Sequence, residues 1–184
     1  MYYAGIKKLD IANGEGVRVT LFVSGCRNRC KGCFQPETWS FTYGEPFTEQ
    51  TAEQLLCAIE HPSVRGLSVL GGEPMEPENQ EGLLPLLRAF KARFPEKNVW
   101  LYTGNLYEEL TGALGEHEKC LPITSELLSY VDILVDGRFE EDKKQLGLRF
   151  RGSSNQRIID MNETRSQGRV VIWHGCSEDK KYNV

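Results

Sequence analysis

The stretch Val17-Arg-Val-Thr-Leu-Phe-Val-Ser24, which continues through Gly25 into Cys26-Arg-Asn-Arg-Cys30-Lys-Gly-Cys33, indicates both the fold and the chemistry of this chain. Its first half is apolar, β-branched and partly alternating, so it predicts a strand. The three cysteines follow in a polar loop with the spacing C-x3-C-x2-C. A [4Fe-4S] cubane usually binds four cysteines, so three thiolates from one loop leave one iron open. We therefore predict that Cys26, Cys30 and Cys33 bind a cluster with a vacant coordination position.

The cysteine triplet has two other interpretations. A structural zinc site usually has four ligands, often in two pairs, and no second pair is present. The other cysteines, Cys57, Cys120 and Cys176, have no cysteine partner two to four residues away. Packing alone can bury unrelated thiols, but three in one polar, glycine-containing loop argue against that origin. We expect structural roles for Cys57 and Cys120, while an auxiliary ligand or redox role stays open for Cys176.

The composition is that of a soluble domain. The chain has 184 residues, is 40% hydrophobic and carries a formal net charge of -4. The negative charge argues against a nucleic-acid partner, which would need a basic patch. No apolar run approaches the roughly 20 residues of a membrane span, and the first residues do not form a signal peptide. We therefore expect a cytoplasmic protein that has no membrane partner, in which clustered cysteines indicate metal binding or catalysis.

Strand-like and helical segments alternate after the cysteine loop. Strands are expected at 67–70, 98–102 and 131–135, and they end in the turns Gly71-Gly-Glu-Pro74, Thr103-Gly104 and Asp136-Gly137. Helices are expected at 52–59, from Gly82 onward with Pro85 in the first turn, at 106–114 and at 123–130. This alternation predicts a parallel sheet of βα units. Because right-handed crossovers align the strands, the turns and the cysteine loop should converge on one edge.

The C-terminal part follows a different pattern. Residues 143–157 are polar and irregular, and two strand-like segments follow at 157–161 and 169–174, which could pair in antiparallel fashion. We expect one domain over residues 1–176 and a polar tail over 177–184.

Several residues at the predicted edge are candidates for ligand binding, and each also has a simpler interpretation. The glycines of Gly71-Gly-Glu-Pro74 would let a ligand approach the backbone, and Glu73 could accept a ligand ammonium, but the turn could also be an ordinary tight turn. Asp136 could contact the same ligand or simply cap a turn. The donor-rich run from Arg149 to Gln156 could bind a carboxylate or ribose, or only hydrate a loop.

These motifs together resemble the radical S-adenosylmethionine (radical SAM) superfamily. Within it, the chain is similar to the activating proteins of anaerobic (class III) ribonucleoside-triphosphate reductase over roughly residues 4–174. The segments that carry the closer resemblance are Val23-Ser-Gly-Cys26, Gly32-Cys-Phe34, Glu37-Thr-Trp39, Tyr102-Thr-Gly104, Val131-Asp-Ile-Leu-Val-Asp-Gly137 and Arg151-Gly-Ser-Ser-Asn-Gln-Arg157. The resemblance implies an α/β fold of the radical SAM type, a partial (βα) barrel open on one side, with a short C-terminal β extension.

The resemblance also implies the site. Cys26, Cys30 and Cys33 would bind three irons of a [4Fe-4S] cluster, and the amino and carboxylate groups of S-adenosylmethionine would bind the fourth. The residues implied as cofactor-binding are Gly32, Cys33, Phe34, Gly71, Gly72, Glu73 and Asp136. Many superfamily members have an aromatic residue where this chain has Gly32, so the adenine contact is expected from the loop backbone and Phe34. The spacer Arg27-Asn28-Arg29 is unusually basic for the family and could tune the cluster or the docking of a partner.

The implied reaction is glycyl-radical formation on the anaerobic reductase. A low-potential donor such as flavodoxin would reduce the cluster, and S-adenosylmethionine would be cleaved to methionine and a 5′-deoxyadenosyl radical. That radical would remove a hydrogen atom from a glycine Cα of the reductase, so no catalytic acid or base is expected. The alternatives are another glycyl-radical enzyme as substrate, a small-molecule radical SAM enzyme of the deazapurine synthase type, and a non-catalytic metal-binding module. The short chain favours a protein substrate.

Overall fold

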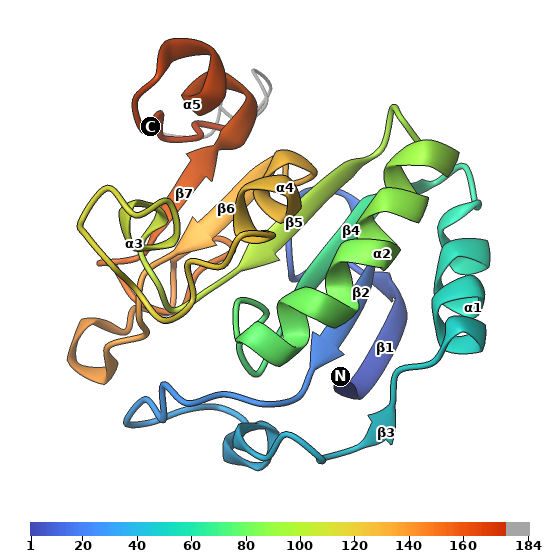
Figure 1. Ribbon diagram of the computed structural model, residues 1–184, viewed down its shortest axis with the longest axis horizontal. Helices are drawn as coiled ribbons and strands as arrows, with labels where there is room; N and C mark the ends of the chain where they lie inside the picture. Colours follow the sequence, from blue (N-terminus) through green and yellow to red (C-terminus); the bar gives the residue numbers. More distant parts are fainter. Residues whose placement is uncertain (176–184) are drawn as a thin grey trace.

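The computed structural model describes residues 1–175, so Cys176 and the predicted tail at 177–184 lie outside the described residues. The protein is a mixed α/β fold with an open seven-stranded sheet of order β3-β1-β2-β4-β5-β6-β7 (Figure 1). The strands are β1 (Tyr2–Asp10), β2 (Val17–Val23), β3 (Glu45–Pro46), β4 (Val64–Gly71), β5 (Asn98–Tyr102), β6 (Ile133–Asp136) and β7 (Arg157–Asp160). The helices are α1 (Glu49–Ile59), α2 (Pro77–Arg93), α3 (Tyr107–Leu110), α4 (Thr124–Ser129) and α5 (Met161–Gln167), with 3-10 turns at Pro36–Trp39 and Glu141–Lys143.

The centre of the sheet is parallel, as the alternation of strands and helices predicts. β2, β4, β5 and β6 pair in parallel, while β1, β3 and β7 are antiparallel to their neighbours. Val23 at the end of β2 lies opposite Gly71 of β4, and Tyr102 at the end of β5 lies opposite Val135 of β6. The strand ends are therefore in register, which brings the loops that follow them to one edge.

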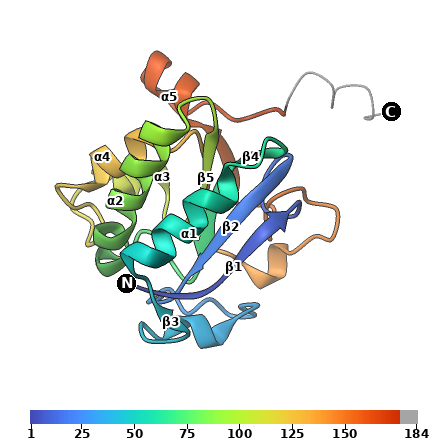
Figure 2. The ribbon, with the colours of Figure 1, turned by 90° about the vertical axis from the view of Figure 1, so that its right-hand side faces the viewer.

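The main core lies between one face of the sheet and the helices. Val19, Leu21, Val69, Leu101 and Leu134 alternate with side chains of the opposite face, and all five are fully buried. They pack against apolar residues of α1, α2 and α4, and α1 and α2 lie on this face in Figure 2. None of the helices within residues 1–175 combines the length and the apolar character needed to cross a membrane.

The other face of the sheet is covered by irregular chain. Trp100, Ile133, Val135 and Ile158 point to this face and form a second, smaller cluster with Phe150. Phe150 belongs to the segment 137–156, most of which falls in the stretch 143–157 that the sequence showed only as polar and irregular. The two faces therefore have different covers, helices on one side and a loop on the other.

Three local expectations were wrong, and two strands were missed. α2 begins at Pro77, so Pro85 lies inside the helix and not in its first turn. The proline ring is on the exposed side, where water can hydrogen-bond the backbone carbonyl that lacks an N–H partner because of the proline. α3 spans only four residues. The stretch after β7 forms α5, and the expected last strand is reduced to a single bridge between Ile159 and Ile172. β1 and β3 were missed, because β1 is only half buried and lacks an apolar pattern.

Candidate functional site

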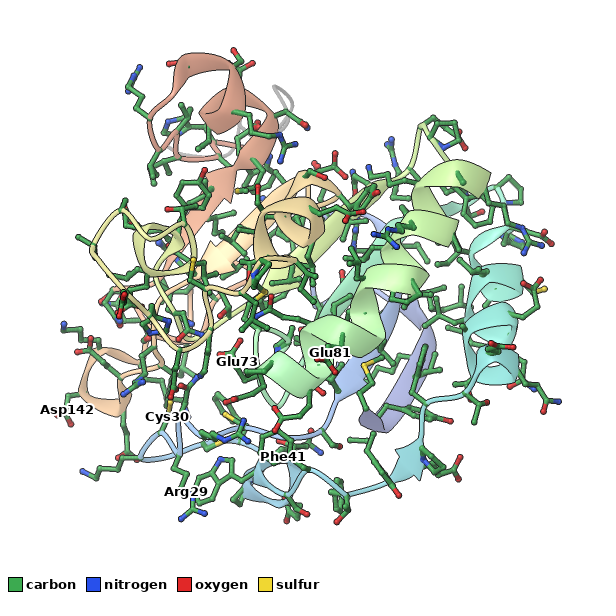
Figure 3. The ribbon with its side chains drawn as sticks, viewed as in Figure 1. Arg29, Cys30, Phe41, Glu73, Glu81 and Asp142 are labelled. Carbon is green, nitrogen blue, oxygen red and sulfur yellow. The ribbon has the colours of Figure 1, made fainter. Side chains whose placement is uncertain are left out.

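A cavity of about 500 Å³ opens at the edge where the parallel strands end. The loop after β2 contributes Cys26, Cys30 and Cys33 to its wall, and the turn after β4 contributes Gly71, Gly72 and Glu73. Thr103 and Gly104 follow β5, and the segment 137–156 closes the opposite side with Phe139, Leu148, Phe150, Arg151, Gly152 and Gln156. In Figure 3, Cys30 and Glu73 lie in the lower part of the molecule, on the side toward which the arrows of the parallel strands point. The sequence motifs thus meet in one cavity.

Two glycines permit close contacts around the start of the cysteine loop, and one of them brings the turn after β4 against that loop. Gly25 has φ +95, and an added Cβ would lie 2.4 Å from the ring of Phe41. A Cβ on Gly72 would lie 2.6 Å from the carbonyl oxygen of Gly25. The backbone N–H of Glu73 donates to that same carbonyl at 2.9 Å. A side chain at Gly72 would separate the two loops, whereas a side chain at Gly25 would displace the ring of Phe41.

Burial favours the protonated form of two of the three thiols in the protein without metal. Burial raises the pKa of Cys26 to about 11 and also raises that of Cys30. Metal binding at this loop must therefore release thiol protons. Among residues 1–175, no group of three or more His, Cys, Asp and Glu side chains converges closely enough to hold a single metal ion. A cubane makes no such demand, because each of its thiolates binds a different iron.

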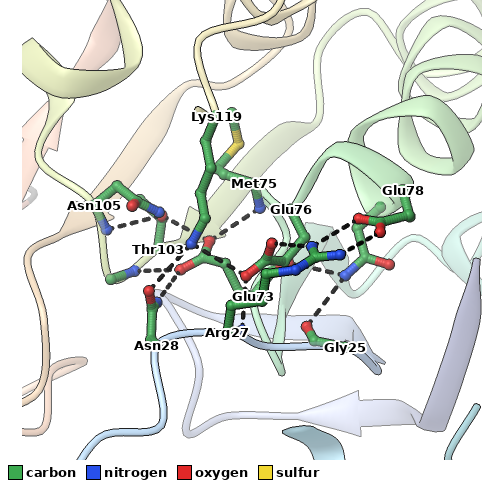
Figure 4. A network of polar contacts seen from close by, with 12 residues as sticks. Gly25, Arg27, Asn28, Glu73, Met75, Glu76, Glu78, Thr103, Asn105 and Lys119 are labelled. Carbon is green, nitrogen blue, oxygen red and sulfur yellow. Dashed lines mark hydrogen bonds and ion pairs between the residues drawn. The ribbon is translucent and has the colours of Figure 1, made fainter. Parts of the chain in front are cut away.

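The Glu73 carboxylate links three loops of the site (Figure 4). Its Oε1 accepts hydrogen bonds from the Met75 N–H at 2.9 Å and the Thr103 hydroxyl at 2.7 Å. Its Oε2 accepts from the Asn28 Nδ2 at 2.7 Å and the Gly104 N–H at 2.8 Å. The side chain is only 1% exposed. Four donors fill the lone pairs of the carboxylate, so Glu73 is bound within the protein rather than free for a ligand ammonium.

A second buried carboxylate holds the spacer between the first two cysteines. Glu76 is fully buried and accepts from the backbone N–H of Arg27 at 2.8 Å and from its guanidinium at 2.6 Å. The same guanidinium binds Glu78. The Lys119 ammonium lies 3.1 Å from Glu76 and donates to the Asn28 Oδ1 at 3.1 Å. The basic character of this spacer is therefore partly neutralised, because Arg27 is paired with two carboxylates.

Phe34 is one of the residues that line the cavity, whereas Gly32, two residues earlier in the loop, is not. Gly32 has φ +71, and its Cα faces the side chain of Glu141. Phe34 lines the cavity, yet it remains 69% exposed. Its ring lies 5.6 Å from that of Phe139, and the Lys144 ammonium lies 4.7 Å from its centroid. An aromatic face is thus available at the entrance.

Asp136 lies outside the cavity wall. It is the last residue of β6 and, like Leu134, faces away from the loop-covered side of the sheet. It accepts from the backbone N–H of Tyr107 at 2.8 Å and from the Arg157 Nε at 2.9 Å, and it is fully buried. Arg157 also binds Glu108 at 2.6 Å. The period-two alternation of the strand explains why this carboxylate does not reach the cavity.

The loop before β7 is held by its own polar groups and faces the cavity. The Gln156 Oε1 accepts from the N–H groups of Gly152 and Ser153, and its amide donates to the Gly137 carbonyl at 2.9 Å. Arg151 donates to the Gln156 carbonyl at 2.7 Å. Arg151, Gly152 and Gln156 line the cavity, so the loop is a wall of the site as well as a hydrated surface.

Sequence reasoning missed several residues that build the site. Asn79 in the first turn of α2 donates to the carbonyls of Ser24 and Glu73, and Lys119 reaches the site from the loop between α3 and α4. The polar run Glu76-Pro-Glu-Asn-Gln80 directly after the glycine turn was a usable signal for Asn79. Lys119 had no such signal, because it lies in an ordinary polar loop.

Comparison with known proteins agrees with this geometry. A family model described as a 4Fe-4S single cluster domain matches residues 12–159. The anaerobic ribonucleoside-triphosphate reductase-activating protein of Pasteurella multocida is 40% identical over 160 residues, which cover 86% of this chain and 96% of the relative. The protein of the same name from Enterobacteria phage T4 is 38% identical over 158 residues, which cover 86% of this chain and 93% of the relative. The one from Escherichia coli (strain K12) is 36% identical over 158 residues, which cover 85% of this chain and 96% of the relative. This chain belongs to the family of anaerobic ribonucleoside-triphosphate reductase-activating proteins.

Proposed function

We propose that this protein is a radical SAM enzyme that generates the glycyl radical of an anaerobic ribonucleoside-triphosphate reductase. The observation that carries the proposal is the meeting of three thiols and the Gly71-Gly-Glu-Pro74 turn in one cavity, joined by the buried Glu73. The names of the relatives support the choice of the reductase as the partner.

The cysteine loop would bind the cluster, and the turn after β4 would bind S-adenosylmethionine. Cys26, Cys30 and Cys33 would bind three irons of a [4Fe-4S] cluster and leave the fourth for the amino and carboxylate groups of S-adenosylmethionine. Because the Glu73 carboxylate is already occupied by four donors, we assign the ammonium to the backbone of Gly71 and Gly72. Glu73 then orients that turn against the cysteine loop.

The remaining predicted residues would take less direct roles. Phe34 at the mouth of the cavity, with the backbone of Gly32 and Cys33, would pack on the adenine. Asp136, which pairs with Arg157 outside the cavity, would support the rim rather than touch the cofactor. The apolar side chains of Phe22, Leu70 and Phe150 line the cavity and would exclude water from a radical reaction.

When bound and reduced by a low-potential donor such as flavodoxin, the cluster supplies the electron that cleaves S-adenosylmethionine to methionine and a 5′-deoxyadenosyl radical. The protein would bring a glycine Cα of the reductase to this radical. We regard the open sheet as part of a (βα) barrel whose missing side admits the glycine-bearing segment. We place the protein in the cytoplasm, where the reductase would be its partner.

Electron paramagnetic resonance tests the proposal directly. The protein is reconstituted anaerobically with iron and sulfide, reduced, and mixed with S-adenosylmethionine and the anaerobic reductase. We expect the doublet of a glycyl radical on the reductase. Cys30→Ala should lose cluster and doublet together, whereas Cys57→Ala, which changes an exposed cysteine outside the cavity, should retain both.

The possible negative results have different meanings. Failure to form a reducible cluster, or a cluster that never cleaves S-adenosylmethionine, would contradict the radical SAM activity. A doublet on another glycyl-radical enzyme but not on this reductase would contradict the choice of partner only. Cleavage retained in Cys30→Ala would contradict the ligand assignment.

A further inference from the structure

A buried lysine lies behind the cysteine loop. The side chain of Lys119 is 2% exposed, although it starts from the loop between α3 and α4. Its ammonium lies 3.1 Å from the Glu76 Oε1 and 3.1 Å from the Asn28 Oδ1 (Figure 4). A charge taken out of water costs free energy unless it is paired and hydrogen-bonded, so this position requires an explanation.

Asn28 connects the lysine to the cysteine loop. It is the central residue of the spacer between Cys26 and Cys30. Its carbonyl oxygen accepts from Lys119 and, at 3.3 Å, from Arg138, while its amide nitrogen donates to Glu73 at 2.7 Å. The amide is therefore oriented by a cation on one side and a carboxylate on the other, which holds the spacer at a defined place.

The backbone of Lys119 is also held. Its carbonyl accepts hydrogen bonds from the Gln80 amide at 2.9 Å and the Thr124 hydroxyl at 3.1 Å. Gln80 belongs to α2 and Thr124 to α4, so two helices fix the point from which the lysine side chain extends. The ammonium is thus a preorganised charge.

The charge of Lys119 is buried, whereas that of Arg27 is partly exposed. Arg27 also binds Glu76, but its side chain is 48% exposed and shares its charge with Glu78. Solvent screens an exposed charge much more than a buried one. Of these two cations beside the loop that carries the thiols, Lys119 is therefore the one whose charge water screens less.

We propose that Lys119 is a positioning residue of the cluster site, which holds the Cys26–Cys30 spacer through Asn28 and raises the reduction potential of the bound cluster. The inference rests on the proposed function only in that it requires a cluster at this loop. Reduction adds one negative charge to the cluster, and a nearby buried cation stabilises the reduced form more than the oxidised form. Removing the cation should therefore lower the potential and make the cluster harder to reduce.

A redox titration of the reconstituted protein, followed by electron paramagnetic resonance without S-adenosylmethionine, tests the effect of the charge. We expect Lys119→Met to have a more negative midpoint potential than the wild type. The matched control is Lys91→Met, which removes a lysine paired with Asp132 near the start of β5, at the opposite edge of the sheet, and should leave the potential unchanged. Equal potentials for Lys119→Met and wild type would overturn the electrostatic part of the proposal.

Changes at Glu76 separate a loss of charge from a loss of structure. Glu76→Gln alone removes a buried negative charge and should raise the potential. The double variant Lys119→Met/Glu76→Gln restores the local charge balance, avoids an unpaired buried carboxylate and should return the potential toward that of the wild type. If all three variants shifted the potential in the same direction, distortion rather than charge would be the cause, and the proposal would be wrong.

Hydrogen–deuterium exchange of the cluster-free protein tests the positioning. Residues 26–33 should exchange faster in Lys119→Met and in Asn28→Ala than in the wild type, whereas Lys91→Met should leave them unchanged. Unchanged exchange in both site variants would overturn the positioning role. These measurements need neither S-adenosylmethionine nor the reductase, so a failure of glycyl-radical formation would not be confused with a failure of this inference.

Discussion

The Glu73 carboxylate joins the loops that follow β2, β4 and β5 through hydrogen bonds to Asn28, Thr103 and Gly104. A glutamate in a glycine-rich turn beside a cluster suggests a ligand for an ammonium, which is how the sequence was interpreted. Its four donors within the protein favour a different role, that of a buried connector. The distinction depends on side chains far away in the sequence, and spacing alone does not show it.

Glu73→Gln should destabilise the cluster-free protein. The substitution turns one acceptor oxygen into an NH₂ group that faces two donors and removes the charge that strengthens all four hydrogen bonds. We expect the free energy of unfolding to fall by about 3 kcal/mol, since hydrogen bonds to charged groups contribute more than neutral ones. Urea denaturation measures the change. The control Glu37→Gln, at an exposed position, should change it by less than about 0.5 kcal/mol, and equal effects of the two would contradict the connector role.

The residues of the site differ in how well the sequence predicts them. Cys26, Cys30 and Cys33 are predictable because their spacing within one loop is itself the chemical signal. Lys119 is not, because its partner Asn28 is 91 positions away and only the packed fold brings the two together. Buried polar partners of this kind need three-dimensional information.

At the scale of elements, β5 and Asp136 show what a strand pattern can and cannot predict. The range 98–102 was expected and is found for β5, because a short apolar run between polar turns marks a buried strand. Asp136 was expected at the cavity, but the pleat of β6 turns it toward the helix-covered face. The start of α2 was predicted too late in the sequence, because Pro85 was taken to mark the first turn. A proline is tolerated inside this helix because its ring is exposed. Element type was thus easier to predict than the face or the boundary.

Gly72→Ala should separate the turn after β4 from the cysteine loop. An added Cβ would lie 2.6 Å from the Gly25 carbonyl oxygen and 3.0 Å from that of Thr38, and neither backbone can move easily. We expect a loss of about 2 kcal/mol in the free energy of unfolding and faster removal of iron by a chelator after reconstitution. Gly147→Ala is the matched control, because an added Cβ there meets nothing within 4 Å. If the chelator removed iron from Gly72→Ala as slowly as from the wild type, the close approach of the two loops would not be needed for cluster binding.

The contact between α3 and β7 should depend on pH through Glu108. The Arg157 guanidinium lowers the pKa of Glu108 below its ordinary value of 4.5. A carboxyl whose pKa is lower in the folded state stabilises the fold above its unfolded pKa, and this stability is lost as pH falls through the folded pKa. We expect Glu108→Gln to cost about 1 kcal/mol at pH 7, and the difference from wild type to shrink as the pH falls below 4.5, the ordinary pKa of a glutamate, and to vanish once the carboxyl is protonated in both states.

Thermal unfolding of the cluster-free proteins at a series of pH values measures this dependence. The control is Glu140→Gln, whose pair with Lys143 is exposed on both sides and should contribute little at any pH. A Glu108→Gln deficit that persists unchanged into strong acid would contradict the assignment to the ion pair.

At the scale of the whole molecule, the helices and the site occupy different parts of the sheet. α1, α2 and α4 supply the larger core on one face of the sheet, and only a smaller apolar cluster lies on the other face. The segment 137–156 covers the other face and also lines the cavity. The sequence predicts the edge at which the loops converge, because parallel βα topology determines it, but not which irregular segment covers the second face. We expect the reductase, the proposed substrate, to approach the cavity beside this segment.

The approach of the reductase beside the segment 137–156 can be tested with two exposed leucines. Leu146 is fully exposed within this segment, two residues from the cavity-lining Leu148, whereas Leu114 is 67% exposed in the loop between α3 and α4. Neither is part of the core, so Leu146→Ser and Leu114→Ser should fold as the wild type does. Burial of a leucine in an interface contributes about 1.5 kcal/mol, so Leu146→Ser should weaken binding of the reductase about tenfold, and Leu114→Ser should not. Biolayer interferometry with the immobilised reductase measures both dissociation constants, and a larger loss with Leu114→Ser would place the contact on the other side of the molecule.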